Sequence, residues 1–241
     1  MSTNISTNIA MVLGTMSVIF WLLAYIGIIW RGFKDRSFGM PVTALSTNFS
    51  WEFIYSFIYQ PFKDYLHILS IPWFFFDIPI AIQCLLYGPK DFKSEIIRKN
   101  FSIIFLLSIA IAFTIQLRFF YEFNDWYASY TGFGINMMMS ILFIAMLLRR
   151  NSIDGQSLYI ALFKWLGTLF ALFSTAFDAY AELNIPISFY KLLIETITHE
   201  NYPFTPLVKI LYYFTFMFDL IYIVLLYNKI KEVKINPWAR F

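Results

Sequence analysis

The sequence predicts an all-α protein embedded in a membrane, and three observations predict it. Hydrophobic residues make up 59% of the 241 residues and charged residues only 14%, against roughly 25% charged in a soluble domain. Long apolar stretches recur, most of them near the 20 or so residues that a helix needs to cross a bilayer. The charges are concentrated between these stretches, in loops too short to fold alone. We therefore expect one transmembrane domain over residues 1–241.

The first three expected spans are Ile9–Trp30, Met40–Gln60 and Pro72–Tyr87. No basic region and no small-residue cleavage site accompany the first, so we expect it to stay in the protein rather than act as a cleaved secretory signal. The second span carries a carboxylate, Glu52, near its middle. The third is short and contains Asp77 and Pro79, which leaves its ends poorly defined.

The other four expected spans are Phe101–Phe120, Thr131–Leu148, Leu158–Ala181 and Phe204–Tyr227. Asp154 precedes the sixth span at a position typical of a helix cap. The seventh span carries Asp219 near its middle. The chain thus predicts seven transmembrane helices.

The distribution of basic residues predicts the orientation, because such residues mark the cytoplasmic side. They occupy the loops after the first, third and fifth spans and the C-terminal tail: Arg31, Lys34, Arg36, Lys90, Lys93, Arg98, Lys99, Arg149, Arg150, Lys229, Lys231, Lys234 and Arg240. The opposite loops carry Lys63 and Lys191 among acidic residues. We expect the N-terminus outside or in the lumen and the C-terminus in the cytoplasm, in the plasma membrane of a bacterium or the endoplasmic reticulum of a eukaryote.

A weak internal similarity suggests two three-helix units joined by the fourth helix. The second and sixth spans each carry an acid, Glu52 and Asp178, and so do the third and seventh, Asp77 and Asp219. Under the expected orientation each pair runs in the same direction, as a parallel repeat requires. This 3+1+3 arrangement is an expectation about topology and assigns no function.

Four acids within the spans are the candidate functional residues, since an ionisable group at membrane depth is costly unless it is paired or faces a cavity. Glu52 and Asp219 lie near mid-depth, whereas Asp77 and Asp178 are expected nearer the outer face. Helical spacing gives the central two polar neighbours on one face: Asn48, Tyr55 and Tyr59 beside Glu52, and Tyr212, Thr215 and Tyr222 beside Asp219. Asn136 and Ser140 form a milder stripe on the fifth span. These faces are expected to line an interior cavity.

We expect no basic side chain to neutralise the central pair. Lys164 lies near the cytoplasmic start of the sixth span, and Arg118 and Lys209 lie near outer ends, from which they can extend to the surface. A carboxyl in an apolar site without a cation is favoured in its neutral form. At least one of Glu52 and Asp219 is therefore expected to hold a proton. The alternative is that all four acids are structural and form hydrogen bonds between helices.

Carbocation chemistry needs a proton donor in a dry pocket with aromatic walls. Ring faces stabilise a desolvated cation by roughly 0.5 to 2 kcal/mol each, and exclusion of water prevents premature quenching. The rings nearest the acids are those of Trp51, Tyr55, Trp73, Phe76, Phe216, Phe218 and Tyr222. Ordinary packing explains most such rings equally well, and Trp51 and Trp73 are the stronger candidates for a pocket.

Several short runs resemble the small seven-helix membrane terpene cyclases of fungal meroterpenoid and indole-diterpene pathways, which have bacterial relatives. These runs are NFSWEFIY at 48–55, WFFFD at 73–77, RRNSIDGQSLYIALFKWLGT at 149–168 and FMFDLIY at 216–222. The length and the number of spans agree with that family. The likeness therefore covers most of the chain.

The resemblance implies that Glu52 and Asp219 are the two essential acids. One of them protonates an epoxide or alkene of a prenyl chain, the other assists, and either order of roles is open. Asn48, Trp51, Tyr55, Trp73, Asp77, Asn136, Phe216 and Tyr222 are the predicted substrate-binding residues. The resemblance implies no metal or other cofactor, unlike enzymes that ionise a diphosphate, and the sequence contains no DDxxD-type cluster. The expected partners are a prenylated or epoxidised-prenyl substrate and membrane lipid.

The leading alternative is a small transporter with the 3+1+3 layout, whose central acids carry protons or cations. Pro79 and Gly167 are the candidate helix breakers, but they do not occupy corresponding helices. A retinal-binding photoreceptor is disfavoured because Lys209 lies too near the outer end of the seventh span. One cysteine, Cys84, excludes a disulfide framework. Dispersed basic residues argue against nucleic acid, and no motif indicates a protein partner.

Overall fold

The computed structural model describes residues 2–59, 64–182, 198 and 200–241, and all regular secondary structure in these ranges is helical. Gln60, the predicted end of the second span, lies outside the described residues, as do Lys63, Lys191 and Glu195. The α-helices are α1 (Ser2–Lys34), α2 (Val42–Phe53), α3 (Asp64–Tyr87), α4 (Glu95–Lys99), α5 (Phe101–Phe123), α6 (Ser129–Arg150), α7 (Leu158–Glu182) and α9 (Pro206–Glu232). A π-helix, η1 (Ile54–Ile58), continues α2, and short 3₁₀ helices cover Gly88–Asp91 (η2) and Pro237–Ala239 (η3). The predicted all-α fold is confirmed.

Within the described ranges, six helices are long and apolar enough to cross a membrane, and they correspond to six of the seven predicted spans. The second predicted span is the exception, because α2 has 12 residues and gives way to the five-residue π-helix η1. The third span is longer than predicted: α3 begins at Asp64 and accommodates Pro72 and Pro79 inside the helix. Its earlier start places Asp77 near mid-helix, so the expectation that this acid lies near the outer face is wrong.

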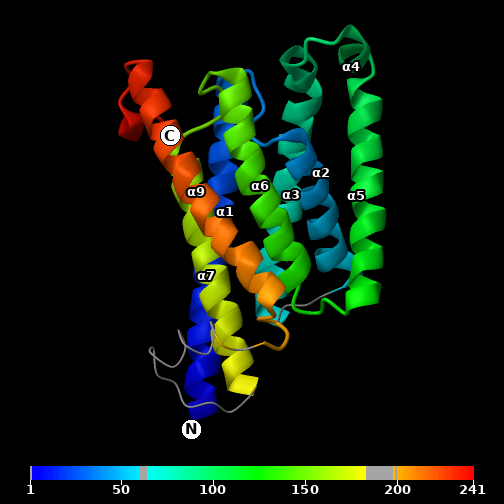
Figure 1. The fold of residues 1–241 in the computed structure, drawn as a ribbon, viewed down its shortest axis with the longest axis vertical. Helices are drawn as coiled ribbons and strands as arrows, with labels where there is room; N and C mark the ends of the chain where they lie inside the picture. The colour runs from blue at the N-terminus through cyan, green and yellow to red at the C-terminus, as the bar shows by residue number, and fades with distance from the viewer. Residues whose placement is uncertain (1, 60–63, 183–197, 199) are drawn as a thin grey trace.

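The helices form an elongated bundle in which α1 and α7 lie side by side and α5 lies on the opposite flank (Figure 1). Ser17 Oγ donates to the carbonyl of Gly167 at 2.8 Å, and Ser174 Oγ donates to that of Ala10 at 2.8 Å. A Cβ atom at Gly167 would lie 2.6 Å from a ring carbon of Trp21. Gly167 therefore permits close packing of α1 on α7, rather than breaking α7.

The basic segments gather at the end of the bundle that holds the C-terminus (Figure 1). Asp35, after α1, pairs with Arg31 and with Arg240 of the tail, and it accepts a hydrogen bond from the backbone N–H of Gly155. At the same end, Asp91 pairs with Arg150 of α6. The alternation of loops between two ends thus agrees with the predicted order of spans, while the 3+1+3 repeat stays a prediction.

Candidate active site

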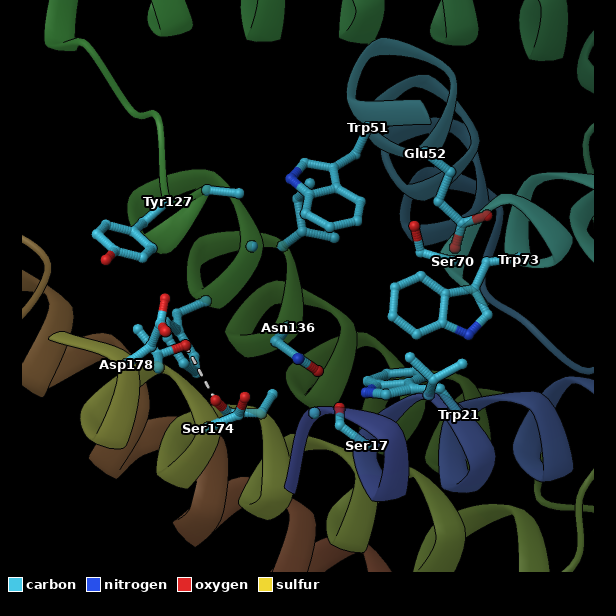
Figure 2. Close-up of a pocket in the computed structure, with 18 of the residues that line it drawn as sticks. Ser17, Trp21, Trp51, Glu52, Ser70, Trp73, Tyr127, Asn136, Ser174 and Asp178 are labelled. Atoms are coloured by element: carbon cyan, nitrogen blue, oxygen red, sulfur yellow. Dashed lines mark hydrogen bonds between the residues drawn. The ribbon is translucent and has the colours of Figure 1, made fainter. Parts of the chain in front are cut away.

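A cavity of about 380 Å³ lies between α1, α2, α3, α6 and α7 (Figure 2). It is long, because Thr7 and Tyr25, 18 residues apart on α1, both line it, and such a separation corresponds to roughly 27 Å along a helix. Its wall is mainly apolar side chains with a few polar groups, the usual make-up of a small-molecule site.

Glu52 and three indole rings form one end of the cavity. Trp51 and Glu52 come from α2, Trp73 from α3 and Trp21 from α1, and Figure 2 shows them grouped together. Trp51 and Glu52 are neighbours in the sequence of α2, and both line the cavity, so a wide face of this helix borders it. Trp51 Nε1 donates to Thr131 Oγ1 at 3.1 Å, which fixes its ring against α6.

The two oxygens of the Glu52 carboxyl differ in their surroundings. Oε1 accepts hydrogen bonds from the Tyr25 hydroxyl and from Asn48 Nδ2, the latter at 2.9 Å. Oε2 is buried and has no hydrogen-bond partner among the described residues. Glu52 is only 2% exposed. One oxygen therefore holds the side chain in place, and the other has no such contact in the described part of the chain.

Asp77 is the carboxyl that accompanies Glu52. Asn48 Nδ2 donates to Asp77 Oδ2 at 2.9 Å as well as to Glu52 Oε1. Asp77 is fully buried, and its other oxygen has no hydrogen-bond partner in the described part of the chain. It lies behind the wall and does not line the cavity. The two acids of α2 and α3 thus share one amide at the same depth.

Asp219 is held elsewhere, and the expectation that no cation reaches it is wrong. Lys164 Nζ lies 2.7 Å from Asp219 Oδ1 and 3.0 Å from Oδ2, and it also donates to Ser140 Oγ at 2.8 Å. Lys164 and Asp219 are both buried, and neither lines the cavity. The position of the Lys164 α-carbon near the start of α7 does not give the depth of its ammonium group, because the long side chain extends inward to Asp219.

Three further predicted residues lie outside the cavity. The Tyr55 hydroxyl is 2.9 Å from Thr131 Oγ1 and also contacts Asp125. Phe216 packs against Trp165 and Tyr212. The Tyr222 hydroxyl donates to Gln156 Oε1 at 2.9 Å. Glu52, Asn48, Trp51, Trp73 and Asn136 are the predicted residues that the cavity brings together.

The opposite end of the cavity is polar. Asp178 and Ser174 of α7 and Tyr127, which precedes α6, lie there, with Asn136 of α6 between the two ends (Figure 2). Asp178 was noted in the sequence as an acid of the sixth span without a binding role. Its place in the cavity follows from the long contact of α1 with α7, which the sequence does not reveal.

Asp125 fixes the segment that carries Tyr127. Its carboxylate accepts hydrogen bonds from the backbone N–H groups of Tyr130 and Thr131 and from the Tyr202 hydroxyl. Burial raises the pKa of Tyr202, and the nearby charge of Asp125 raises it further. Tyr202 therefore stays a neutral donor at this end of the bundle.

Sequence reasoning missed Tyr25 and Trp21, both of α1. The first span contains no acid, so no costly group drew attention to its polar face. A tyrosine hydroxyl buried in a span needs a partner, and that signal was present at Tyr25, but one sequence does not say which helix supplies the partner. Within the described ranges no group of three or more His, Cys, Asp or Glu side chains is placed to hold a metal ion.

The sequence model of the Pyr4-like transmembrane terpene cyclases matches residues 4–232. The chain is similar to asnovolin H synthase of Aspergillus novofumigatus, with 27% identity over 67% of this chain and 68% of that protein. It is also similar to a Pyr4-family terpene cyclase of Annulohypoxylon moriforme, with 25% identity over 76% of this chain and 79% of that protein. A terpene cyclase of Penicillium crustosum shares 27% identity over 72% and 75%. No solved structure matches the chain significantly.

Proposed function

The chain belongs to the Pyr4-like transmembrane terpene cyclases, and on this premise we propose that Glu52 gives up the proton that starts cyclisation of a prenyl substrate. The observation that carries the proposal is the unpartnered Oε2 of Glu52, buried at the indole-lined end of the cavity. The transporter alternative is not favoured, because the similar proteins are named as terpene cyclases or as a synthase.

In the proposed step, the proton on Glu52 Oε2 moves to the oxygen of a terminal epoxide. A C–O bond breaks with its electron pair going to oxygen, and the electron-deficient carbon is attacked by the next alkene of the chain. With an alkene in place of the epoxide, the proton adds to carbon and leaves a cation on the neighbouring carbon. Each ring closure moves the positive charge along the chain until a proton is lost. Glu52 then regains a proton, and the net change is an isomerisation.

The surroundings of Glu52 support a proton-bearing carboxyl. Glu52 and Asp77 share the Asn48 amide, and in the described part of the chain no Lys or Arg forms an ion pair with either of them. Two carboxylates that share one site repel each other, and burial favours the neutral form of at least one. We propose that Glu52 is the donor because it lines the cavity and Asp77 does not.

The indoles of Trp21, Trp51 and Trp73 supply the proposed stabilisation of the cation. All three line the cavity at the Glu52 end. A desolvated cation over an indole face gains up to about 2 kcal/mol, which becomes substantial when several rings act in succession. Packing alone would account for indoles between helices, but these three border an open volume.

Asp219 is proposed to act through Lys164 and not on the substrate. The ion pair also includes Ser140 and lies behind Trp21, whose ring centroid is 5.9 Å from Lys164 Nζ. A buried pair of this kind fixes the relative position of α6, α7 and α9. We therefore propose a positioning role for Asp219, in place of the catalytic role that the resemblance implied.

We propose the finer topology on the same basis. The helical residues 42–58 cover roughly 25 Å. Their number is at the lower limit of the roughly 17 to 25 residues that a transmembrane helix contains, and they would make a seventh crossing in a single domain. The basic end of the bundle would face the cytoplasm, with the N-terminus outside or in the lumen. The proposed chemistry needs no metal, since a carboxyl supplies the proton.

The proposed function is tested by supplying membranes that contain the protein with epoxidised prenyl acceptors and examining the products by mass spectrometry and NMR. We expect cyclic isomers of unchanged mass, which membranes without the protein do not form. If several acceptors enter the membranes and none is cyclised, while a relative treated alike is active, the proposal is wrong.

Substitution of Tyr25 with Phe is expected to lower kcat about threefold to tenfold with little change in KM. The variant removes the hydroxyl that holds Glu52 Oε1, and one hydrogen bond is worth roughly 0.5–1.5 kcal/mol. The matched control is Tyr222→Phe, which removes a buried hydroxyl outside the cavity. Steady-state kinetics of both variants decide the matter: equal losses in the two would show that Tyr25 contributes only stability.

A further inference from the structure

Gly132 lies on the face of α6 that lines the cavity. Asn136 and Met139 follow it at steps of four and three residues, which keeps them on the same face of the helix, and all three line the cavity. On the other side of Gly132 along the chain, Ala128 and Tyr127 line it as well. Gly132 therefore borders the passage between the end of the cavity that holds Tyr127 and the part beside Asn136.

Close packing of helices does not explain a glycine at this position. Apart from the backbone of its own helix, a Cβ atom at Gly132 would have one neighbour within 4 Å among the described residues, Trp51 Cζ2 at 3.6 Å, which is an ordinary contact. At Gly167, by contrast, a Cβ atom would lie 2.6 Å from a ring carbon of Trp21. Gly132 also lies inside α6, where glycine is less favourable than alanine. Its missing side chain leaves open volume beside Trp51, and this volume belongs to the cavity that both residues line.

The Trp51 ring is held in place next to Gly132. Its Nε1 donates to Thr131 Oγ1 at 3.1 Å, and its ring centroid is 4.8 Å from that of Tyr55. Thr131 Oγ1 in turn donates to Asp125 Oδ2 at 2.7 Å, and Asp125 is fully buried. The ring is thus tied to α6 by the residue that precedes Gly132. Atoms added at position 132 would therefore take space from the cavity instead of displacing the indole.

The cavity is small, so one side chain changes what it can hold. Its volume of about 380 Å³ is near the lower end of the roughly 300 to 1,000 Å³ that ligand sites have. The walls formed by α1 and α7 are fixed to each other, because Ser17 and Ser174 each donate to a backbone carbonyl of the other helix. Both helices line the cavity with small side chains, which are those of Ala10, Gly14, Ser17, Ala171 and Ser174.

We propose that Gly132 determines the length of the prenyl chain that the cavity accepts, because its missing side chain lets a chain of farnesyl length pass Trp51. A geranyl chain, which is one isoprene unit shorter, can stay on the Glu52 side of this point. A farnesyl chain whose reacting end is at Glu52 must extend beside Gly132. Gly132 is thus a specificity residue and takes no part in proton transfer. The inference rests on the proposed function in one respect, namely that a prenyl chain occupies the cavity with its reacting end at Glu52.

The inference is tested by binding, which does not depend on turnover. The full chain in lipid nanodiscs is titrated with two radiolabelled phenols, one with a saturated geranyl chain and one with a saturated farnesyl chain, neither of which has an alkene to protonate. Empty nanodiscs give the partition of each ligand into lipid, which is subtracted. We expect Gly132→Leu to weaken binding of the farnesyl ligand about tenfold or more, since even one methylene too many in an apolar pocket has an effect of this size. Binding of the geranyl ligand should stay nearly unchanged.

A smaller substitution and a matched control accompany this variant. Gly132→Ala adds a Cβ atom that makes only an ordinary contact, so we expect it to fold and to show a smaller loss of the same kind. Gly134→Leu is the control, because Gly134 lies two residues further along α6, does not line the cavity, and offers open space for a Cβ atom. It should leave the ratio of the two affinities unchanged. Thermal unfolding in nanodiscs shows which variants are folded.

The inference is overturned if the folded Gly132 variants keep the wild-type ratio of affinities, if both ligands lose affinity equally, or if the wild type binds neither ligand. Turnover of epoxidised substrates by the wild type is measured separately. Cyclic products together with an unchanged ratio in the Gly132 variants would refute the role of Gly132 alone. The expected change of ratio without any cyclic product would refute the proposed cyclisation alone, so the two failures give different results.

Discussion

Replacing Glu52 with Gln is expected to reduce cyclisation by at least 10²- to 10⁴-fold, about the usual contribution of a positioned proton donor. Gln has nearly the same size and still offers a carbonyl oxygen to Tyr25 and Asn48, the two partners of Glu52 Oε1. What it lacks is the acidic proton proposed for the unpartnered oxygen. The variant should therefore fold and bind substrate but form almost no cyclic product.

Product formation per mole of purified protein is the measurement, with thermal unfolding as the test of folding. Glu95→Gln is the matched control, because Glu95 pairs with Lys99 on the exposed helix α4 and lies outside the cavity. That control should keep full activity. Normal turnover by a folded Glu52→Gln protein would remove Glu52 from the mechanism and direct attention to Asp77.

Replacing Asp219 with Asn is expected to lower the free energy of unfolding by about 3–5 kcal/mol, because it leaves a buried lysine without its partner. Asp219 and Lys164 are buried and 2.7 Å apart. The exposed pair of Lys229 and Glu232 is the control: Glu232→Gln should cost less than about 1 kcal/mol. Denaturant titration in detergent micelles compares the two.

The double variant Lys164→Met, Asp219→Leu separates stability from catalysis. It removes both charges and fills the site with apolar side chains, a change that is often neutral or stabilising for buried pairs. We expect it to recover most of the stability that Asp219→Asn loses, and to retain measurable cyclisation. A double variant that is stable but wholly inactive would contradict the positioning role and return Asp219 to the chemistry.

Most of the fold was predictable, because a span is recognised by its length and apolar composition alone. Six of the expected spans correspond to long helices. The segment around Glu52 was harder, since the change from α2 to the π-helix η1 depends on packing and leaves no mark in composition. The start of α3 was misjudged because Asp64 and His67 made the first two turns look like a loop.

The candidate site was predictable only within each helix. Helical spacing correctly placed Asn48 beside Glu52, and the two are hydrogen-bonded. Which helices face each other is decided by packing across the bundle, and there the expectation failed. Glu52 accepts a hydrogen bond from Tyr25 of α1, and the Asn48 amide links it to Asp77 of α3. Asp219 pairs instead with Lys164 of α7. Helical periodicity predicts which side chains share a face of a helix, but it does not predict which helix packs against that face.

The Lys164–Asp219 pair has a consequence for how the chain is assembled during synthesis. The two residues are 55 positions apart, and α9 leaves the ribosome after α7. Until α9 is inserted, Lys164 has no carboxylate with which to pair. It lies six residues after Leu158, the first residue of α7, close enough to the surface for its ammonium to reach water. A lysine at the centre of α7 could not place its ammonium in water and would hinder insertion of the helix. The position of Lys164 near the start of α7 therefore allows it to pair late with Asp219.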